Sequence, residues 1–193
     1  MPALPITPPQ TVGPFFSGCL LKDDLSVLVG PDTDGEHIRI EGRVLDGDGQ
    51  PVPDALVEIW QANAHGRYNH PLDTRELPLD PAFTGFGRSG TDDEGRFAFE
   101  TVKPGAVPFD EETLQAPHIC VTVMARGLLS HLSTRLYFAD DPANAADPVL
   151  QRVPPERWET LLAQPEPQPH EGHTVYRFDI VLQGERETVF FDW

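Results

Sequence analysis

Apolar and polar residues alternate in short runs along much of the chain. In the segment 37–45, Ile38, Ile40 and Val44 occupy even-numbered positions, and the odd-numbered positions from 37 to 43 are polar. A period of two is typical of a half-buried β-strand, and turn signals such as Asp46–Gly49 separate the runs. The pattern therefore predicts an all-β fold, a two-sheet β-sandwich with long loops, whose strands lie at 37–45, 55–60, 96–100, 118–125, 132–138, 174–182 and 187–191.

Other segments depart from this alternation. One or two short helices are expected in the chain. The clearest candidate is 154–163, which begins with two prolines and places Glu156 in the first turn. The proline-rich residues 1–36 are expected to form an irregular N-terminal arm that docks on a partner chain, and 37–193 to form the β-sandwich domain. The segment 63–88 is rich in Pro, Gly and Asp, and a loop of that length is typically functional.

Composition narrows the classes of function. The chain has 193 residues, enough for one domain with its own core, and its 21 prolines and 16 glycines fit many short elements joined by turns. A net charge of −17 argues against nucleic acid and anionic membranes as partners. An anionic substrate would need a local basic residue to overcome this field.

Cysteine content and the first residues bear on the compartment. Cys19 and Cys120 are too few for a disulfide framework and suit a reducing environment. The N-terminal residues lack the basic and apolar regions of a signal peptide, and no apolar run has the length of a membrane span. We therefore expect a cytoplasmic protein.

The chain lacks the familiar short motifs for phosphate, zinc and nucleophile sites. Two clusters of possible ligands remain. His65, Tyr68 and His70 lie on the long loop, and His118 and Cys120 lie two residues apart on one face of a predicted strand. The second pair could bind a soft metal such as zinc, or both side chains could simply pack against their neighbours.

Several segments together resemble the intradiol dioxygenase family. They are Gly42–Tyr68, Phe86–Gly95, Val102–Gly105 and Ala116–Ile119, and the likeness extends over roughly the whole chain. Family members hold Fe(III) with two tyrosinates and two histidines, and phenolate oxygen is a hard, anionic donor that suits ferric iron. The resemblance implies an enzyme that cleaves a catechol ring between its two hydroxylated carbons.

This sequence retains half of that ligand set. Tyr68 and His118 match the first tyrosine and the first histidine, but Val107 and Cys120 stand where the second tyrosine and second histidine are expected. Gln115 replaces the family's catalytic arginine. We therefore expect Tyr68 and His118 to be vestigial, with no metal and no catalytic residue in this chain.

This departure is typical of the alpha subunit in heteromeric members of the family, whose beta subunit carries the Fe(III). The expected substrates are protocatechuate (3,4-dihydroxybenzoate) and O₂, in the β-ketoadipate pathway of aromatic catabolism. By resemblance, the alpha subunit lines the partner's substrate pocket, here with Thr11, Gly13, Pro14, Phe15 and Arg126. Arg126 could attract the substrate's carboxylate, or it could form an ordinary surface ion pair.

Two other functions fit parts of the sequence. A non-enzymatic transthyretin-like binding domain shares the strand–turn–strand pattern from Gly42 to Asp54. A stand-alone metalloenzyme could use His65, Tyr68, His70 and His118. The missing ligands argue against the second, and the combined motifs through His118 argue against the first.

Overall fold

The computed structural model describes residues 16–21 and 23–192. Within them lie one α-helix, α1 (Phe16–Leu20), and three 3-10 helices, η1 (Pro142–Ala146), η2 (Leu150–Arg152) and η3 (Pro155–Leu161). No helix in this part of the chain is long and apolar enough to cross a membrane. The strands are β1 (His37–Leu45), β2 (Leu56–Trp60), β3 (Phe86–Gly90), β4 (Arg96–Val102), β5 (Val107–Pro108), β6 (Leu114–Gln115), β7 (His118–Met124), β8 (Leu132–Phe138), β9 (Leu162–Pro165), β10 (Thr174–Arg177) and β11 (Ile180–Val181).

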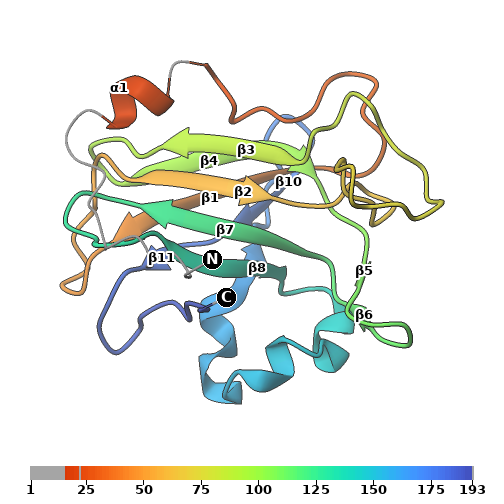
Figure 1. Cartoon of the computed structure of the whole chain (residues 1–193). Helices are drawn as coiled ribbons and strands as arrows, with labels where there is room; N and C mark the ends of the chain where they lie inside the picture. The colour runs from red at the N-terminus through yellow and green to blue at the C-terminus, as the bar shows by residue number, and fades with distance from the viewer. Residues whose placement is uncertain (1–15, 22, 193) are drawn as a thin grey trace, which may run out of the picture.

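Nine strands form one sheet that curves around the core (Figure 1). Their order is β11-β1-β10-β9-β8-β7-β2-β3, with β4 paired to β1, while β5 and β6 form a separate hairpin. The short β9 pairs with β10 on one side and β8 on the other. The all-β class is confirmed, whereas the division into two separate sheets is not, because the ladder continues through β9.

The pattern of β1 shows why these residues form this sheet. Ile38 and Ile40 are 1% exposed and face the core, whereas Arg39 and Glu41 face outward and form an ion pair of 2.7 Å. Burying each large apolar side chain contributes about 1.5–3 kcal/mol. The core between the two halves of the sheet is filled by such residues from most strands, including Val57, Ile59, Phe97, Phe99, Ile119, Val121, Leu136, Phe138 and Tyr176, and by Phe83 of the β2–β3 loop.

A second apolar cluster covers the other face of β8. Tyr137 is fully buried there against Leu150 and Leu161 of the 3-10 helices. The predicted helix at 154–163 is a 3-10 helix that ends at Leu161, because the chain then enters β9. Within the described residues, the predicted strand at 187–191 forms a bridge from Phe191 to Ser133 and no longer ladder.

The arm predicted at 1–36 is described in part. Residues Leu25 and Val27 form bridges to Arg88 of β3 and Glu100 of β4, and Leu28 enters the core. This stretch therefore packs on its own chain.

The connections at one end of the sheet position the candidate site. The long loop between β2 and β3 and the β5–β6 hairpin both lie at this end, on the right of Figure 1. They lie beside the ends of β2, β7 and β8. The strands thus provide one wall of a hollow, and the connections provide the others.

Candidate functional site

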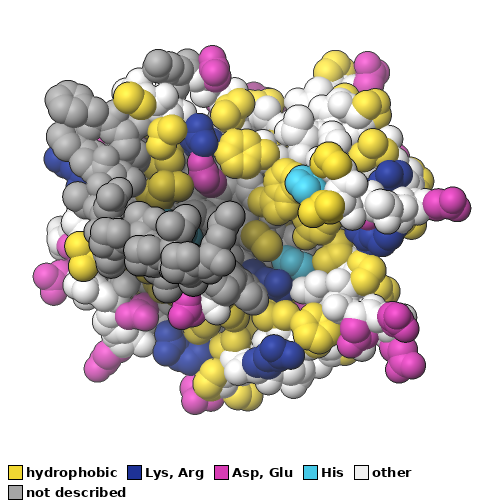
Figure 2. Space-filling view, in the orientation of Figure 1, with side chains coloured by type: hydrophobic (Ala, Val, Ile, Leu, Met, Phe, Trp, Pro, Cys, Tyr) yellow, Lys and Arg dark blue, Asp and Glu magenta, His cyan; other side chains and the backbone are white. Residues whose placement is uncertain are grey.

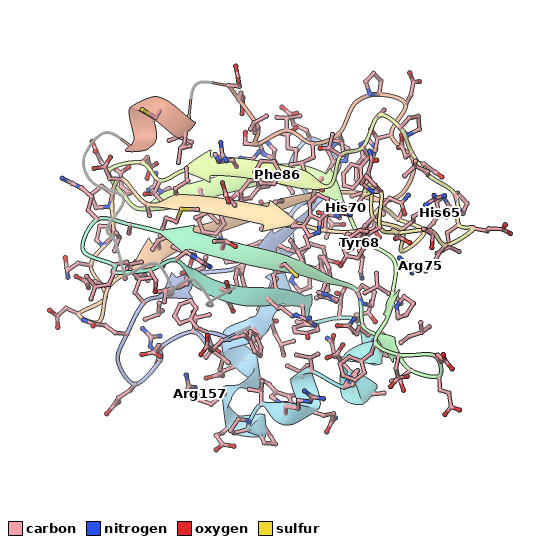
Figure 3. All side chains as sticks on the ribbon, viewed as in Figure 1. His65, Tyr68, His70, Arg75, Phe86 and Arg157 are labelled. Atoms are coloured by element: carbon pink, nitrogen blue, oxygen red, sulfur yellow. The ribbon has the colours of Figure 1, made fainter. Side chains whose placement is uncertain are left out.

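A cavity of about 680 Å³ lies at this end of the sheet. Figure 3 places Tyr68, His70 and Arg75 beside the end of β2, and Figure 2 shows hydrophobic side chains next to histidine and basic ones around a hollow there. The walls come from the β2–β3 loop, the β5–β6 hairpin and the outer faces of three strands. They are formed by Trp60, Tyr68, His70, Leu72, Asp73, Thr74, Arg75, Val107, Pro108, Gln115, His118, Cys120 and Arg135.

Three side chains stand in one row across the sheet wall. Trp60 of β2 lies opposite Cys120 of β7, and Cys120 lies opposite Arg135 of β8. Because side chains alternate along a strand, Cys120 points away from the core that its neighbours Ile119 and Val121 fill. The row brings an indole, a thiol and a guanidinium to one surface of the cavity.

Close backbone packing brings the two loop walls together. Gly66 has a φ of +76°, and a Cβ there would lie 2.1 Å from the carbonyl oxygen of Ala106. Only glycine permits both this backbone angle and this approach. Tyr68 lies two residues after Gly66, and Val107 lies two residues after Gly105, whose own Cβ would meet Gly66 N at 2.5 Å. Both side chains consequently line the same cavity.

Asp73 organises the loop after Tyr68. Its carboxylate accepts hydrogen bonds from the backbone N of Tyr68 at 2.8 Å and from Nε and Nη2 of Arg75 at 2.8 and 2.6 Å. These bonds, chiefly those from Arg75, hold the pKa of Asp73 well below its usual range despite burial. The two side chains form an ion pair at the cavity wall.

Tyr68 lies flat against the indole of Trp60. The ring centroids are 5.7 Å apart and the planes differ by 17°. Burial raises the pKa of the Tyr68 hydroxyl to about 12, and the charge of Arg135 only partly opposes that shift. The hydroxyl is therefore a neutral phenol at pH 7.

His118 is also neutral at pH 7. Burial lowers its pKa to about 4, and the charge of Arg135 acts in the same direction. Nδ1 of His118 donates a hydrogen bond to the carbonyl oxygen of Ala116 at 2.8 Å. The lone pair of the ring then resides on Nε2, which makes His118 able to accept a hydrogen bond or bind a metal.

Arg135 joins the strand wall to the hairpin. Its Nη1 donates to Oε1 of Gln115 at 2.7 Å and to the hydroxyl of Tyr137 at 3.3 Å. Burial raises the pKa of the Cys120 thiol, and Arg135 opposes this shift without cancelling it. The cavity thus presents a fixed guanidinium beside a protonated thiol.

The donor set does not fit the ferric ion that the family resemblance implies. The four ligand positions do meet at one cavity, but Val107 has no donor atom and Cys120 offers a protonated thiol. Only Tyr68 and His118 have donors of the expected kind. Among the described residues, no group of three or more His, Cys, Asp or Glu side chains could hold a metal ion.

The other sequence candidates lie elsewhere. Nε2 of His65 contacts Asp34 at 2.7 Å, and His65 does not line the cavity that Tyr68, His70 and His118 share. Arg126 follows β7 at its opposite end and pairs with Asp54 at 2.9 Å, with 56% of its side chain exposed. The remaining pocket candidates, Thr11, Gly13, Pro14 and Phe15, lie outside the described residues.

Sequence reasoning missed Arg135, Trp60 and the Asp73–Arg75 pair. The alternation in 132–138 could have indicated that Arg135 faces outward, since Thr134 and Leu136 are buried. The register that places it opposite Cys120 depends on the pairing of two strands and is not a local signal.

Comparison with known proteins identifies the family. The sequence model of a family described as Dioxygenase matches residues 12–184. The chain is 48% identical over 204 residues to the protocatechuate 3,4-dioxygenase alpha chain of Burkholderia cepacia, covering 100% of both chains. It is 44% identical over 158 residues to the beta chain from the same organism, covering 80% of this chain and 67% of the relative.

A solved structure agrees with these sequence matches. The dioxygenase domain of a dioxygenase and carbohydrate-binding protein fusion from Streptomyces sp. SirexAA-E superposes with a TM-score of 0.64 at 28% identity, covering 92% of this chain and 98% of that one. The family match extends through all the strands of the sheet and the cavity-lining loops. It decides against a transthyretin-like domain. The chain belongs to the intradiol ring-cleaving dioxygenase family.

Proposed function

We propose that this chain is the alpha subunit of a protocatechuate 3,4-dioxygenase, and that its iron resides on a homologous beta subunit. The observation that carries the proposal is the composition of the cavity, where Val107 and Cys120 occupy two of four ligand positions. Full-length identity of 48% to an alpha chain supports it, and the 44% identity to a beta chain indicates that such partners share this fold.

The complete enzyme cleaves 3,4-dihydroxybenzoate with O₂. The bond between the two hydroxylated ring carbons breaks, both atoms of O₂ enter the product, and 3-carboxy-cis,cis-muconate forms. The reaction belongs to the β-ketoadipate pathway of aromatic catabolism, and we place the enzyme in the cytoplasm. The iron supplied by the beta subunit activates the catechol for O₂, and no bond-making step falls to this chain.

This chain contributes to the partner's substrate pocket. Arg126 is exposed, and its guanidinium can pair with the carboxylate of the substrate in place of Asp54. That attraction is valuable in a chain with a net charge of −17, which otherwise repels an anion. Thr11, Gly13, Pro14 and Phe15 complete the pocket wall, within the first part of the arm (1–36), which docks on the partner beside the domain formed by 37–193. The contribution of this chain to catalysis is to position the substrate in the partner's pocket.

Separate and joint expression tests the proposal. This chain and a homologous beta chain are purified alone and together, and O₂ consumption is measured with 3,4-dihydroxybenzoate. We expect the two chains to co-purify in equal amounts and only the complex to reach full activity. Full activity of this chain alone, or its failure to associate with the beta chain, would contradict the proposal.

A further inference from the structure

The β5–β6 hairpin projects from one end of the molecule (Figure 1). Its two strands pair with each other as a separate sheet, and residues 109–114, which join them and begin β6, form the tip of the hairpin. The backbone N of Phe109 donates to the carbonyl oxygen of Thr113 at 2.8 Å. Oδ1 of Asp110 accepts from the backbone N of Glu112 at 3.0 Å and of Thr113 at 2.8 Å. The chain's own hydrogen bonds therefore fix the shape of the tip, which lowers the entropy cost of docking it on a partner.

The tip exposes apolar and acidic groups together. Phe109 is 40% exposed and Leu114 is 61% exposed, and Asp110, Glu111 and Glu112 lie between them. Within the part of the chain that the structure describes, none of these three carboxylates has an ion-pair partner. Exposed apolar side chains beside charged ones are typical of surfaces that bind another protein.

A hollow of about 570 Å³ lies at the opposite end of the sheet. Its walls come from the end of β1 and the turn after it, the start of β4, and the chain from the end of β10 towards β11. The turn after β1 lies on the left of Figure 1, whereas the hairpin tip lies on the right. We call this hollow the arginine pocket; it is lined by Arg43, Leu45, Gly49, Pro51, Glu94, Arg96, Arg177 and Asp179.

Two like charges stand side by side in the arginine pocket. Arg43 of β1 lies directly opposite Arg96 of β4 in the antiparallel ladder, a relationship in which like charges destabilise a sheet. Arg43 pairs with Asp179 at 2.7 Å. Among the described residues, the ion pair of Arg96 is with Glu94 at 3.8 Å, with 63% and 61% of the two side chains exposed, and such a pair contributes little. An additional carboxylate would therefore relieve the repulsion between the two arginines.

The tip and the arginine pocket complement each other. The tip presents carboxylates beside Phe109 and Leu114, and the pocket presents guanidinium groups beside Leu45 and Pro51. The pocket contains three arginines and two carboxylates, so an acidic segment meets an excess of positive charge there although the chain has a net charge of −17. Because the two features lie at opposite ends of the molecule, the tip of one copy can reach the pocket of another copy and not its own.

We propose that this chain associates head to tail with further copies of itself, the tip of one copy occupying the arginine pocket of the next. Glu111 and Glu112 pair with Arg43 and Arg96 across the contact. Such a contact is heterologous, so the copy added last still offers a tip or a pocket, and association continues until the series closes into a ring. The contact requires neither iron nor a beta chain, so its test is independent of the proposed enzymatic role.

Sedimentation velocity of the purified full chain and of two variants tests the proposal. The unchanged chain should form species of three or more copies whose share grows with concentration. Glu111→Lys/Glu112→Lys keeps Asp110 to hold the turn, and Arg96→Glu places a carboxylate opposite Arg43, so both variants should unfold in urea no more easily than the parent chain. Each should weaken association at least about 10-fold, as for loss of charged hydrogen bonds.

The control is Asp32→Lys/Glu159→Lys, which makes the same change in charge at two exposed positions outside the tip and the arginine pocket. It should assemble as the parent chain does. A mixture of the tip variant and the pocket variant gives the sharpest result, because the tip variant keeps its pocket and the pocket variant keeps its tip. This mixture should form 1:1 dimers and nothing larger.

Three results would overturn the proposal. The first is an unchanged chain that stays monomeric up to about 1 mM. The second is undiminished assembly of both folded variants, or a mixture of the two that forms no dimers. The third is association that appears only when a beta chain is added, which would assign the tip to that chain.

Discussion

Cys120 of β7 lies directly opposite Arg135 of β8 across the antiparallel ladder. The pair stands at a position where the family resemblance requires a histidine bound to Fe(III), so a fixed positive charge adjoins a metal-ligand position. A neighbouring cation disfavours a trivalent ion by electrostatic repulsion. The loss of two donor side chains and the positive charge of Arg135 therefore both disfavour binding of Fe(III) in this cavity.

Restoring the two missing donors should restore iron binding. In the double variant Val107→Tyr/Cys120→His, the cavity that already holds Tyr68 and His118 gains a phenol and an imidazole. We expect ferric iron to bind, with a visible tyrosinate-to-iron absorption band that the parent chain lacks. Iron content and the visible spectrum of the purified variant measure this.

The control for that variant is Val107→Phe/Cys120→His, which has nearly the same volume but no second phenolic oxygen. It should bind less iron and show a weaker band. Equal iron and equal colour in both double variants would mean that residue 107 does not face the metal position.

Removal of the Arg126 side chain should weaken substrate binding by the complex. For Arg126→Met we expect the KM for 3,4-dihydroxybenzoate to rise about 10- to 100-fold, as for loss of a charged hydrogen bond. The ion pair with Asp54 is exposed, so stability should change by no more than about 1 kcal/mol. Steady-state kinetics of the reconstituted complex provide the measurement. Arg96→Met, another exposed arginine, is the control, and equal KM values for the two variants would remove Arg126 from the pocket.

The stability that Asp73 provides should depend on pH. Its pKa in the folded chain is lowered, chiefly by Arg75, from an ordinary value of 3.8. A lowered pKa stabilises the fold above the ordinary value, and this contribution is lost as the pH falls below it. Asp73→Asn should therefore cost about 1–3 kcal/mol at pH 7 and less at pH 3.

Urea unfolding of both proteins at the two pH values tests this, with the exposed Asp32→Asn as control. The control should track the parent chain at both pH values. A cost for Asp73→Asn that is the same at pH 3 and pH 7 would show that ionisation of Asp73 is not what stabilises the loop.

Glycine at position 66 should be required for the shape of the cavity. Gly66→Ala combines a positive φ with a Cβ placed 2.1 Å from the Ala106 oxygen, so we expect a loss of at least about 2 kcal/mol in the free energy of unfolding. Gly49 has nearly the same φ, +75°, with nothing within 4 Å of its Cβ. Gly49→Ala should cost only about 1–2 kcal/mol, the backbone term alone. Equal costs, measured by denaturant unfolding, would contradict a role for close packing.

The fold could be predicted where alternation is strong and local. The strands 37–45 and 132–138 have the predicted bounds, and burial alternates from His37 to Val44 in the first and from Ser133 to Leu136 in the second. Phe86–Gly90 was not predicted as a strand, because its two glycines provide little β propensity and its place is set by pairing with β2. Leu162 and Ala163 fall within the helix predicted at 154–163, and tertiary pairing with β8 makes them the start of a strand.

The candidate site could be predicted only in part, for a related reason. Motif positions located Tyr68, Val107, Gln115, His118 and Cys120, and these five do line one cavity. Arg135 belongs to no motif, and its place depends on which residues of β8 face Cys120. A register of that kind is fixed by the whole sheet, so the charge of the cavity could not be derived from local sequence.

Metal analysis of the purified beta chain, this chain and their complex tests the central claim most directly. We predict about one ferric ion per alpha/beta pair, all of it retained by the beta chain when the subunits are separated, and this chain free of bound iron after expression alone in iron-rich medium. Stoichiometric ferric iron in this chain alone, with a colour that disappears in Tyr68→Phe, would contradict the account.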